Sequence, residues 1–157
     1  DLLDGIDKDT YDVIIAQDTL HHLEPINCAV TTISDALKKE GILIAIEENG
    51  SNWIQNLKLI KQRGFKKVKT IYDDVLGKEI LLGDENIRSL ENWNKILEKE
   101  NLCVNNSTVQ YIRYFFPGKY NGKTIEEIVL KEKLIQNKRA FLKRRFFFGL
   151  NFIAQKI

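Results

Sequence analysis

The stretch that decides the fold reads Tyr11-Asp12-Val13-Ile14-Ile15-Ala16-Gln17-Asp18-Thr19-Leu20-His21-His22-Leu23. It opens with a short apolar run over residues 13–16, and a second run of the same kind covers residues 42–46. Continuous β-branched runs of this length are typical of parallel strands that are buried on both faces. We therefore predict strands at residues 11–16 and 42–47.

The residues between the two runs predict a helix at 28–39. Asn27 can cap this helix after Pro25, and Gly41 can end it with a left-handed residue. Strand, helix and strand in this order form a βαβ unit, so the two strands should be adjacent, central and parallel, with the helix on one face. The apolar residues at helical spacing are Ala29, Val30, Ile33, Ala36 and Leu37.

The rest of the chain predicts further helices and two strands of antiparallel character. Residues 64–87 are punctuated by glycines and predict an irregular segment. Residues 104–116 and 146–154 alternate loosely, as antiparallel strands do. Helices are predicted at 52–62, after the cap residue Ser89, and after the capping box that opens at Thr124. Their expected inward residues are Trp53, Leu57 and Ile60; Trp93, Ile96 and Leu97; and Ile125, Ile128, Val129 and Ile135.

Composition favours one soluble domain with an ordinary core. The 157 residues are 43% hydrophobic, and no run approaches the ~20 apolar residues of a membrane span. Cys28 and Cys103 lack a CxxC spacing, which predicts reduced, buried thiols and a cytoplasmic location. Residues 1–48 hold eleven acidic and three basic residues, whereas residues 119–157 hold ten basic and three acidic ones. This asymmetry would suit an anionic partner, but solvated helix faces are the favoured interpretation.

Residues 11–23 closely resemble the fourth strand and following loop of class I S-adenosylmethionine-dependent methyltransferases, whose pattern is (F/Y)-D-x-(V/I)-x-x-x-x-x-L-H-H-(L/I). Residues 36–44 resemble the family's L-K-x-G-G-x-L entry into the fifth strand, with Glu40 in place of the first glycine. The resemblance implies the α/β, Rossmann-like methyltransferase sheet: parallel strands, a final antiparallel strand pair, and helices on both faces. It further implies a single partial domain over residues 1–157, with a family-specific insertion at about 49–87.

The resemblance also implies which residues hold the cofactor, S-adenosylmethionine. Ligands of open α/β sheets bind beyond the carboxyl ends of the strands, where Gln17, Asp18 and Thr19 follow the first run. Asp1, with Leu2, lies eleven residues before Asp12, the spacing at which the family has an acidic residue near the adenine ring. No GxGxG occurs in these residues, so we expect the ribose and methionine contacts upstream of residue 1 and weak cofactor binding by this chain alone.

His21 and His22 are the candidate catalytic residues. An oxygen or nitrogen acceptor often needs a base, and a histidine of pKa ~6.5 suits that task. The alternative is a structural pair that packs against the cofactor or caps the next helix. The two side chains should differ in exposure, with His22 facing the pocket. No metal site is predicted, because adjacent histidines are expected to point apart and the spacing matches no zinc pattern.

The predicted function is methyl transfer from S-adenosylmethionine to an oxygen or nitrogen atom of a small or medium-sized acceptor. Glu47, Glu48 and Asn49 would face the acceptor pocket or the solvent. One alternative is a binding or scaffold protein that kept the fold without the chemistry. Another is an RNA methyltransferase that uses the basic segments 58–69 and 138–145, ranked lower because no RNA-binding module is present.

Overall fold

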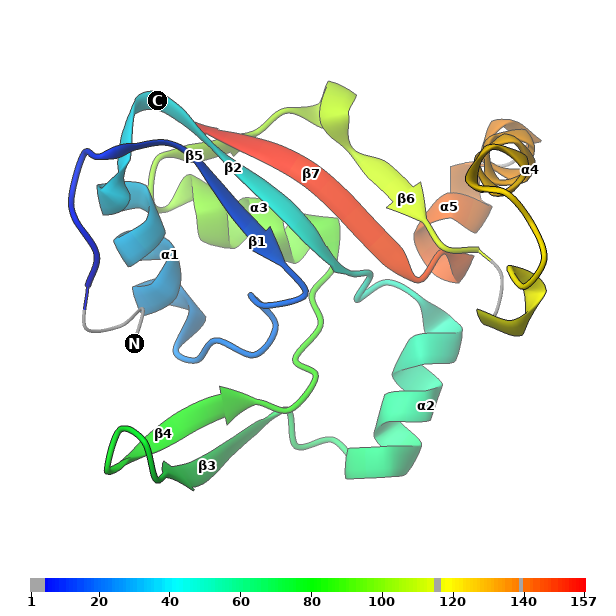
Figure 1. The fold of residues 1–157 in the computed structure, drawn as a ribbon. Coiled ribbons are helices and arrows are strands. Elements are labelled where there is room, and N and C mark those ends of the chain that lie inside the picture. Colours follow the sequence, from blue (N-terminus) through cyan, green and yellow to red (C-terminus); the bar gives the residue numbers. More distant parts are fainter. Residues whose placement is uncertain (1–4, 115–116, 139) are drawn as a thin grey trace.

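A computed structural model describes residues 5–114, 117–138 and 140–157 of the chain. Its main sheet has the strand order β1-β2-β7-β5, and β6 pairs with β7 (Figure 1). β1 runs parallel to β2, whereas β7 is antiparallel to β2, β5 and β6. The fold is therefore α/β with a mixed sheet, as predicted. The strands are β1 (Tyr11–Gln17), β2 (Leu37–Glu48), β5 (Leu102–Val104), β6 (Gln110–Ile112) and β7 (Gly149–Lys156).

The two strands predicted from the apolar runs are adjacent and parallel. Ile14 pairs with Leu43, and Ala16 pairs with Ala45. Within the described residues β2 is central, but β1 forms the edge of the sheet, so the prediction of two central strands holds for β2 alone. Burial on both faces is also wrong for β1, where Ile15 is 65% exposed. The reason is that the helix between the two strands (Ile26–Ala36) packs on the opposite face, where Ile14 and Ala16 join the core.

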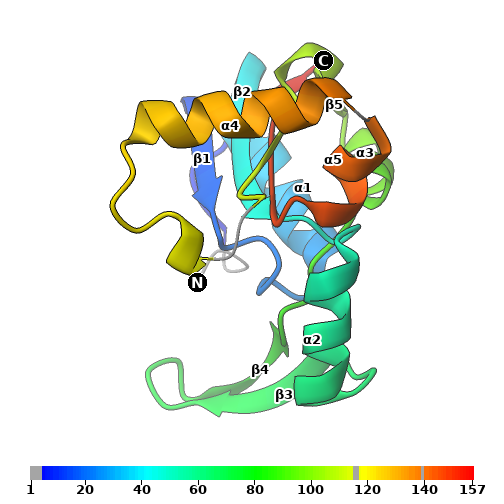
Figure 2. The same ribbon diagram turned by 90° about the vertical axis from the view of Figure 1, so that its right-hand side faces the viewer.

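Helices α1 (Ile26–Ala36) and α3 (Leu90–Glu98) lie on the same side of the sheet (Figure 2). The Ser89 side chain caps α3 by accepting from the Asn92 N–H, as predicted. α1 differs from its prediction at both ends: it begins after Pro25 without a side-chain cap, and it passes directly into β2 at Leu37. The helices and the sheet enclose the core, whose fully buried members include Val30, Leu37, Leu43, Trp93, Leu97, Leu150 and Phe152.

The segment between β2 and α3 is more regular than predicted. Helix α2 (Trp53–Arg63) is capped by Asn52 and is followed by an antiparallel hairpin of β3 (Val68–Asp73) and β4 (Lys78–Gly83). The hairpin forms a separate two-stranded sheet beyond the carboxyl ends of β1 and β2 (Figure 1). The predicted inward face of α2 is wrong, because Leu59 is its buried residue. Trp53, Leu57 and Ile60 are 49%, 68% and 39% exposed.

The C-terminal third departs from prediction mainly in its strands. The single strand predicted at 104–116 is split into β5 and β6 by a turn at Asn106–Thr108, and residues 115 and 116 lie outside the described residues. The predicted capping box opens α4 (Ile125–Lys138), since Thr124 and Glu127 bond each other's backbone N–H. Ile125 and Val129, expected inward, are 75% and 42% exposed. Helix α5 (Ala140–Phe146) then precedes β7.

Both cysteines are free, but the prediction that they are buried is wrong. Cys28 lies on an exposed position of α1, and Cys103 on an exposed position of β5. Among the helices of the described residues, none combines the length and hydropathy that a membrane crossing requires.

Candidate functional site

The loop after β1 turns sharply at the carboxyl end of the parallel strands. Asp18 has a positive φ of 44°, and its N–H donates to the Ile46 carbonyl of β2 at 2.8 Å. Gln17, the last residue of β1, and Asp18 and Thr19, which follow it, are exposed there. The structure therefore brings these predicted cofactor residues to the sheet edge that was expected. Asp1 and Leu2 lie outside the described residues.

Glu47, near the end of β2, holds this loop together. Its side chain is 1% exposed. One carboxylate oxygen accepts from the backbone N–H groups of Thr19 at 3.1 Å and Leu20 at 2.8 Å. The other oxygen lies 2.6 Å from Nδ1 of His21. Because an ionised carboxylate only accepts hydrogen bonds, His21 donates from Nδ1 and its Nε2 is left free to accept or to bind.

The two histidines face each other, contrary to the expectation that neighbours point apart. Their ring centroids are 4.1 Å apart. An extended chain would send the two side chains to opposite sides, but here the backbone turns, with the His22 N–H donating to the Thr19 carbonyl at 3.0 Å. The side chains differ in exposure, as expected: 4% for His21 and 39% for His22.

The β3–β4 hairpin reaches back to the histidines at Gly83. His22 Nδ1 lies 3.0 Å from the Gly83 carbonyl, and the Gly83 N–H donates to the His22 carbonyl at 2.8 Å. A Cβ at Gly83 would lie 2.1 Å from the His21 carbonyl oxygen, so only glycine permits this approach. A bridge between Leu23 and Leu82 extends the contact.

The contact between the hairpin and the histidine loop brings Glu85 close to both histidines. Glu85 was not predicted from the sequence. Its two carboxylate oxygens lie 3.8 Å from His21 Nε2 and 4.0 Å from His22 Nε2. Glu85 follows the hairpin and has a positive φ of 53°. It lies 64 and 63 residues along the chain from the two histidines, in a segment predicted to be irregular, so no local pattern could link it to them.

The cluster around the histidines is rich in carboxylates. Burial lowers the pKa of His21, but the hydrogen bond and charge of Glu47, with the charges of Glu85 and Glu48, raise the pKa above its usual value. Burial also raises the pKa of Glu48. The charges of Glu85 and Asp18 raise the pKa of Glu48 further, whereas the charges of Arg113 and His21 lower it. Arg113 lies 3.4 Å from a Glu48 carboxylate oxygen.

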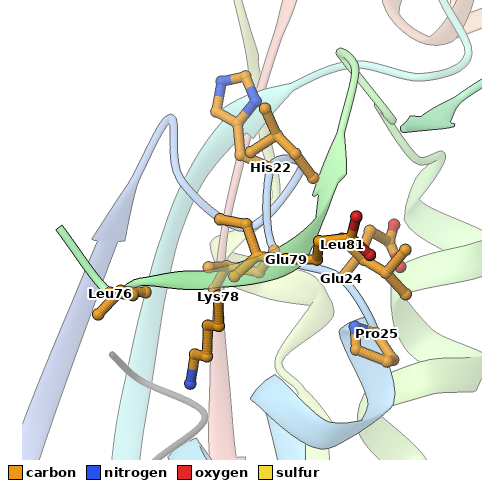
Figure 3. Close-up of a pocket in the computed structure, with 10 residues that line it drawn as sticks. His22, Glu24, Pro25, Leu76, Lys78, Glu79 and Leu81 are labelled. Carbon is orange, nitrogen blue, oxygen red and sulfur yellow. The ribbon is translucent and has the colours of Figure 1, made fainter. Parts of the chain in front are cut away.

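A hollow of about 370 Å³ opens beside His22, between the histidine loop and the hairpin (Figure 3). His22 comes from the loop after β1, whereas Leu76, Lys78 and Leu81 come from the hairpin, and the Lys78 side chain points away from His22 (Figure 3). The lining is mostly apolar and includes few charged groups, a composition and size usual for small-molecule pockets. Its other lining residues are Leu23, Glu24, Pro25, Glu79, Ile80 and Leu82.

Comparison with solved structures gives the class of fold. A Listeria monocytogenes protein, provisionally described as an S-adenosylmethionine-dependent methyltransferase, matches 99% of this chain with a TM-score of 0.56 and 17% identity. An S-adenosylmethionine-dependent methyltransferase from Archaeoglobus fulgidus matches 98% of the chain, with a TM-score of 0.56 and 13% identity. Phosphoethanolamine N-methyltransferase 2 of Haemonchus contortus, solved with S-adenosylmethionine, matches 99% with a TM-score of 0.53 and 15% identity.

The fold is therefore the Rossmann-like fold of class I methyltransferases. The chain spans 66%, 63% and 35% of the length of these three structures. No protein-family model matches the sequence, and no curated protein sequence matches it.

Proposed function

We propose that the protein transfers a methyl group from S-adenosylmethionine to an oxygen or nitrogen atom of a small or medium-sized acceptor. The observation that carries the proposal is the buried His21–Glu47 pair at the carboxyl end of two parallel strands, in a methyltransferase fold. In such sheets this edge is where ligands bind.

The cofactor residues follow from their position at that edge. Gln17 ends β1, Asp18 and Thr19 follow it, and all three are exposed, so we assign them to the cofactor. Asp1 and Leu2 are assigned to it on the family resemblance of the sequence alone. The methyl group of a sulfonium cofactor is already activated, so the protein mainly aligns the acceptor for in-line attack.

Removal of the acceptor's proton is the second chemical requirement, and the histidines are the candidate bases for it. Glu47 fixes the ring of His21 with Nδ1 as the donor, which leaves Nε2 as a proton acceptor. The Gly83 carbonyl fixes His22 in the same way. Both Nε2 atoms point to the region of Glu85, so either imidazole is a candidate base.

The size of the acceptor is inferred from the hollow beside His22. Its volume of about 370 Å³ lies at the lower end of the range for small-molecule sites. The Haemonchus contortus neighbour is named for a small acceptor, phosphoethanolamine, which is consistent with this size class.

The proposal is tested with the full gene product that contains these residues. Calorimetric titration with S-adenosylmethionine should show saturable 1:1 binding. Methyl transfer from a labelled cofactor should then be detected onto members of a panel of small amines and hydroxyl compounds. Asp18→Ala should weaken cofactor binding, whereas Asp74→Ala, in the hairpin turn, should not. Absence of cofactor binding by the folded protein would favour a binding or scaffold role.

A further inference from the structure

We propose that His21, His22 and Glu85 bind a divalent transition-metal ion, and that Zn²⁺ suits the site best. One ligand atom from each residue lies within 4.8 Å of the other two. Two imidazole nitrogens and a carboxylate are a usual ligand set for zinc, whereas Mg²⁺ and Ca²⁺ prefer oxygen ligands alone.

The hydrogen bonds behind the histidines leave the correct atoms free for an ion. Each Nδ1 faces an acceptor: the Glu47 carboxylate at 2.6 Å for His21 and the Gly83 carbonyl at 3.0 Å for His22. A carbonyl cannot donate, so His22 carries its proton on Nδ1. One Glu47 oxygen accepts two backbone N–H groups, and the other accepts from His21 when that ring carries its proton on Nδ1, which is the same tautomer. Metal-bound histidines usually donate their other ring N–H to a carboxylate or a carbonyl in this manner, which fixes the ring orientation.

The ligand atoms are near one another but farther apart than in an occupied zinc site. Zinc bonds of 2.0–2.1 Å in tetrahedral geometry place neighbouring ligand atoms about 3.4 Å apart. The Glu85 oxygens lie 3.8 and 4.0 Å from the two Nε2 atoms. These two distances involve different oxygens of Glu85, and the three ligand atoms lie within 4.8 Å of one another, so closing the site requires a contraction of about half an ångström to about 1.4 Å. Glu85 can supply it, because its side chain is 41% exposed and it lies outside the regular strand.

The surrounding charge also favours a cation. Glu47 and Glu48 end β2 beside the histidines, and Asp18 is near enough to influence Glu48 electrostatically. The positive charge of Arg113 acts on Glu48 and offsets part of this negative charge. Carboxylates gathered around a partly buried site raise the local concentration of cations.

Three protein ligands leave a fourth position for water or for an oxygen or nitrogen atom of a small molecule. With an ion bound, both Nε2 lone pairs are occupied, so neither histidine can take the acceptor's proton. A metal-bound water or hydroxyl group loses its proton near neutral pH and would meet the same need. Metal binding is measured without turnover, so failure of this proposal is distinct from failure of the proposed function.

The experiment titrates Zn²⁺ into the full gene product after treatment with a chelator. Cys28→Ser and Cys103→Ser form the background, because both thiols are exposed and could bind zinc adventitiously. We expect 1:1 binding that Glu85→Gln weakens about tenfold or more. Glu79→Gln is the matched control: it makes the same chemical change at an exposed position of the same hairpin, and it should leave the affinity unchanged.

A second measurement uses Co²⁺ as a spectroscopic probe of the ligands. Bound Co²⁺ should show the visible absorption of a four- or five-coordinate nitrogen and oxygen site, and His22→Ala should abolish it. His22 is half-exposed, so this variant should fold. Absence of 1:1 binding, or equal Zn²⁺ affinity in the Glu85→Gln and Glu79→Gln variants, would overturn the proposal and leave His21, His22 and Glu85 as an ion-pair cluster.

Discussion

His21 Nδ1 lies 2.6 Å from a carboxylate oxygen of Glu47, although 26 residues separate the two in sequence. Glu47 belongs to β2 and His21 to the loop after β1, so the parallel pairing of the two strands creates this contact. The same carboxylate also accepts the N–H groups of Thr19 and Leu20. One buried side chain therefore orients the histidine and fixes the backbone that carries it.

The first prediction concerns the contribution of Glu47 to stability. Glu47→Ala leaves the N–H groups of Thr19 and Leu20 and the ring of His21 without their acceptor, and Leu20 and His21 are buried. We expect the free energy of unfolding in urea to fall by about 3 kcal/mol. Glu47→Gln retains one carbonyl oxygen and should cost less. A loss no larger than that of the exposed control Glu79→Gln would contradict this role.

The second prediction concerns Gly83 and the docking of the hairpin. Gly83→Ala places a Cβ 2.1 Å from the His21 carbonyl oxygen, a backbone atom that cannot move aside alone. We expect a loss of about 2 kcal/mol in the free energy of unfolding, together with loss of the Gly83–His22 hydrogen bonds. Gly118→Ala is the control, since an added Cβ there meets nothing within 4 Å. Equal stability of the two variants would show that the hairpin does not dock as described.

The third prediction is a pH dependence that Glu48 causes. Burial raises the pKa of Glu48 in the folded protein above its unfolded value, so the folded state binds a proton more tightly. Stability contributed by this proton is present at low pH and is lost as pH rises from the unfolded pKa through the folded one. The glutamine of Glu48→Gln does not titrate, so this loss of stability with rising pH is absent in the variant. In chelator-treated protein, the stability of Glu48→Gln relative to wild type should therefore increase as pH rises above about 4, the ordinary pKa of a glutamate. A constant difference would contradict the raised pKa.

The sequence predicts the part of the site that depends on local pattern. The apolar runs at 13–16 and 42–46 are sufficient to place Gln17–Thr19 and both histidines at one edge of a parallel sheet. Resemblance of residues 11–23 to a methyltransferase loop predicts the fold that the solved structures share. What could not be predicted depends on long-range contacts.

Glu85 is the clearest example of such a contact. Its position follows from the close approach of Gly83 to His21, which no periodicity encodes. The inward face of α2 was also misassigned, because a stripe of apolar residues indicates amphipathicity but not which partner covers it. In the described structure, Trp53 and Leu57 remain exposed whereas Leu59 is buried.

The last prediction separates a catalytic from a structural role of the histidines. If one imidazole takes the acceptor's proton, its Nε2 must come within about 3 Å of the acceptor atom, directly or through one water. Replacing that residue by alanine in the full gene product should lower turnover about 10²-fold or more, with cofactor affinity little changed. The assays should be run with a chelator, so that no bound ion replaces the base.

Glu47→Gln identifies which histidine acts. Glu47 bonds Nδ1 of His21 but not of His22, whose Nδ1 faces the Gly83 carbonyl. If His21 is the base, Glu47→Gln should lower kcat and leave KM for the cofactor near its wild-type value, in parallel with His21→Ala. If His22 is the base, His22→Ala should lower kcat while Glu47→Gln changes mainly stability. A structural pair would instead give unchanged turnover at saturation in both alanine variants, with weaker cofactor binding or a lower free energy of unfolding.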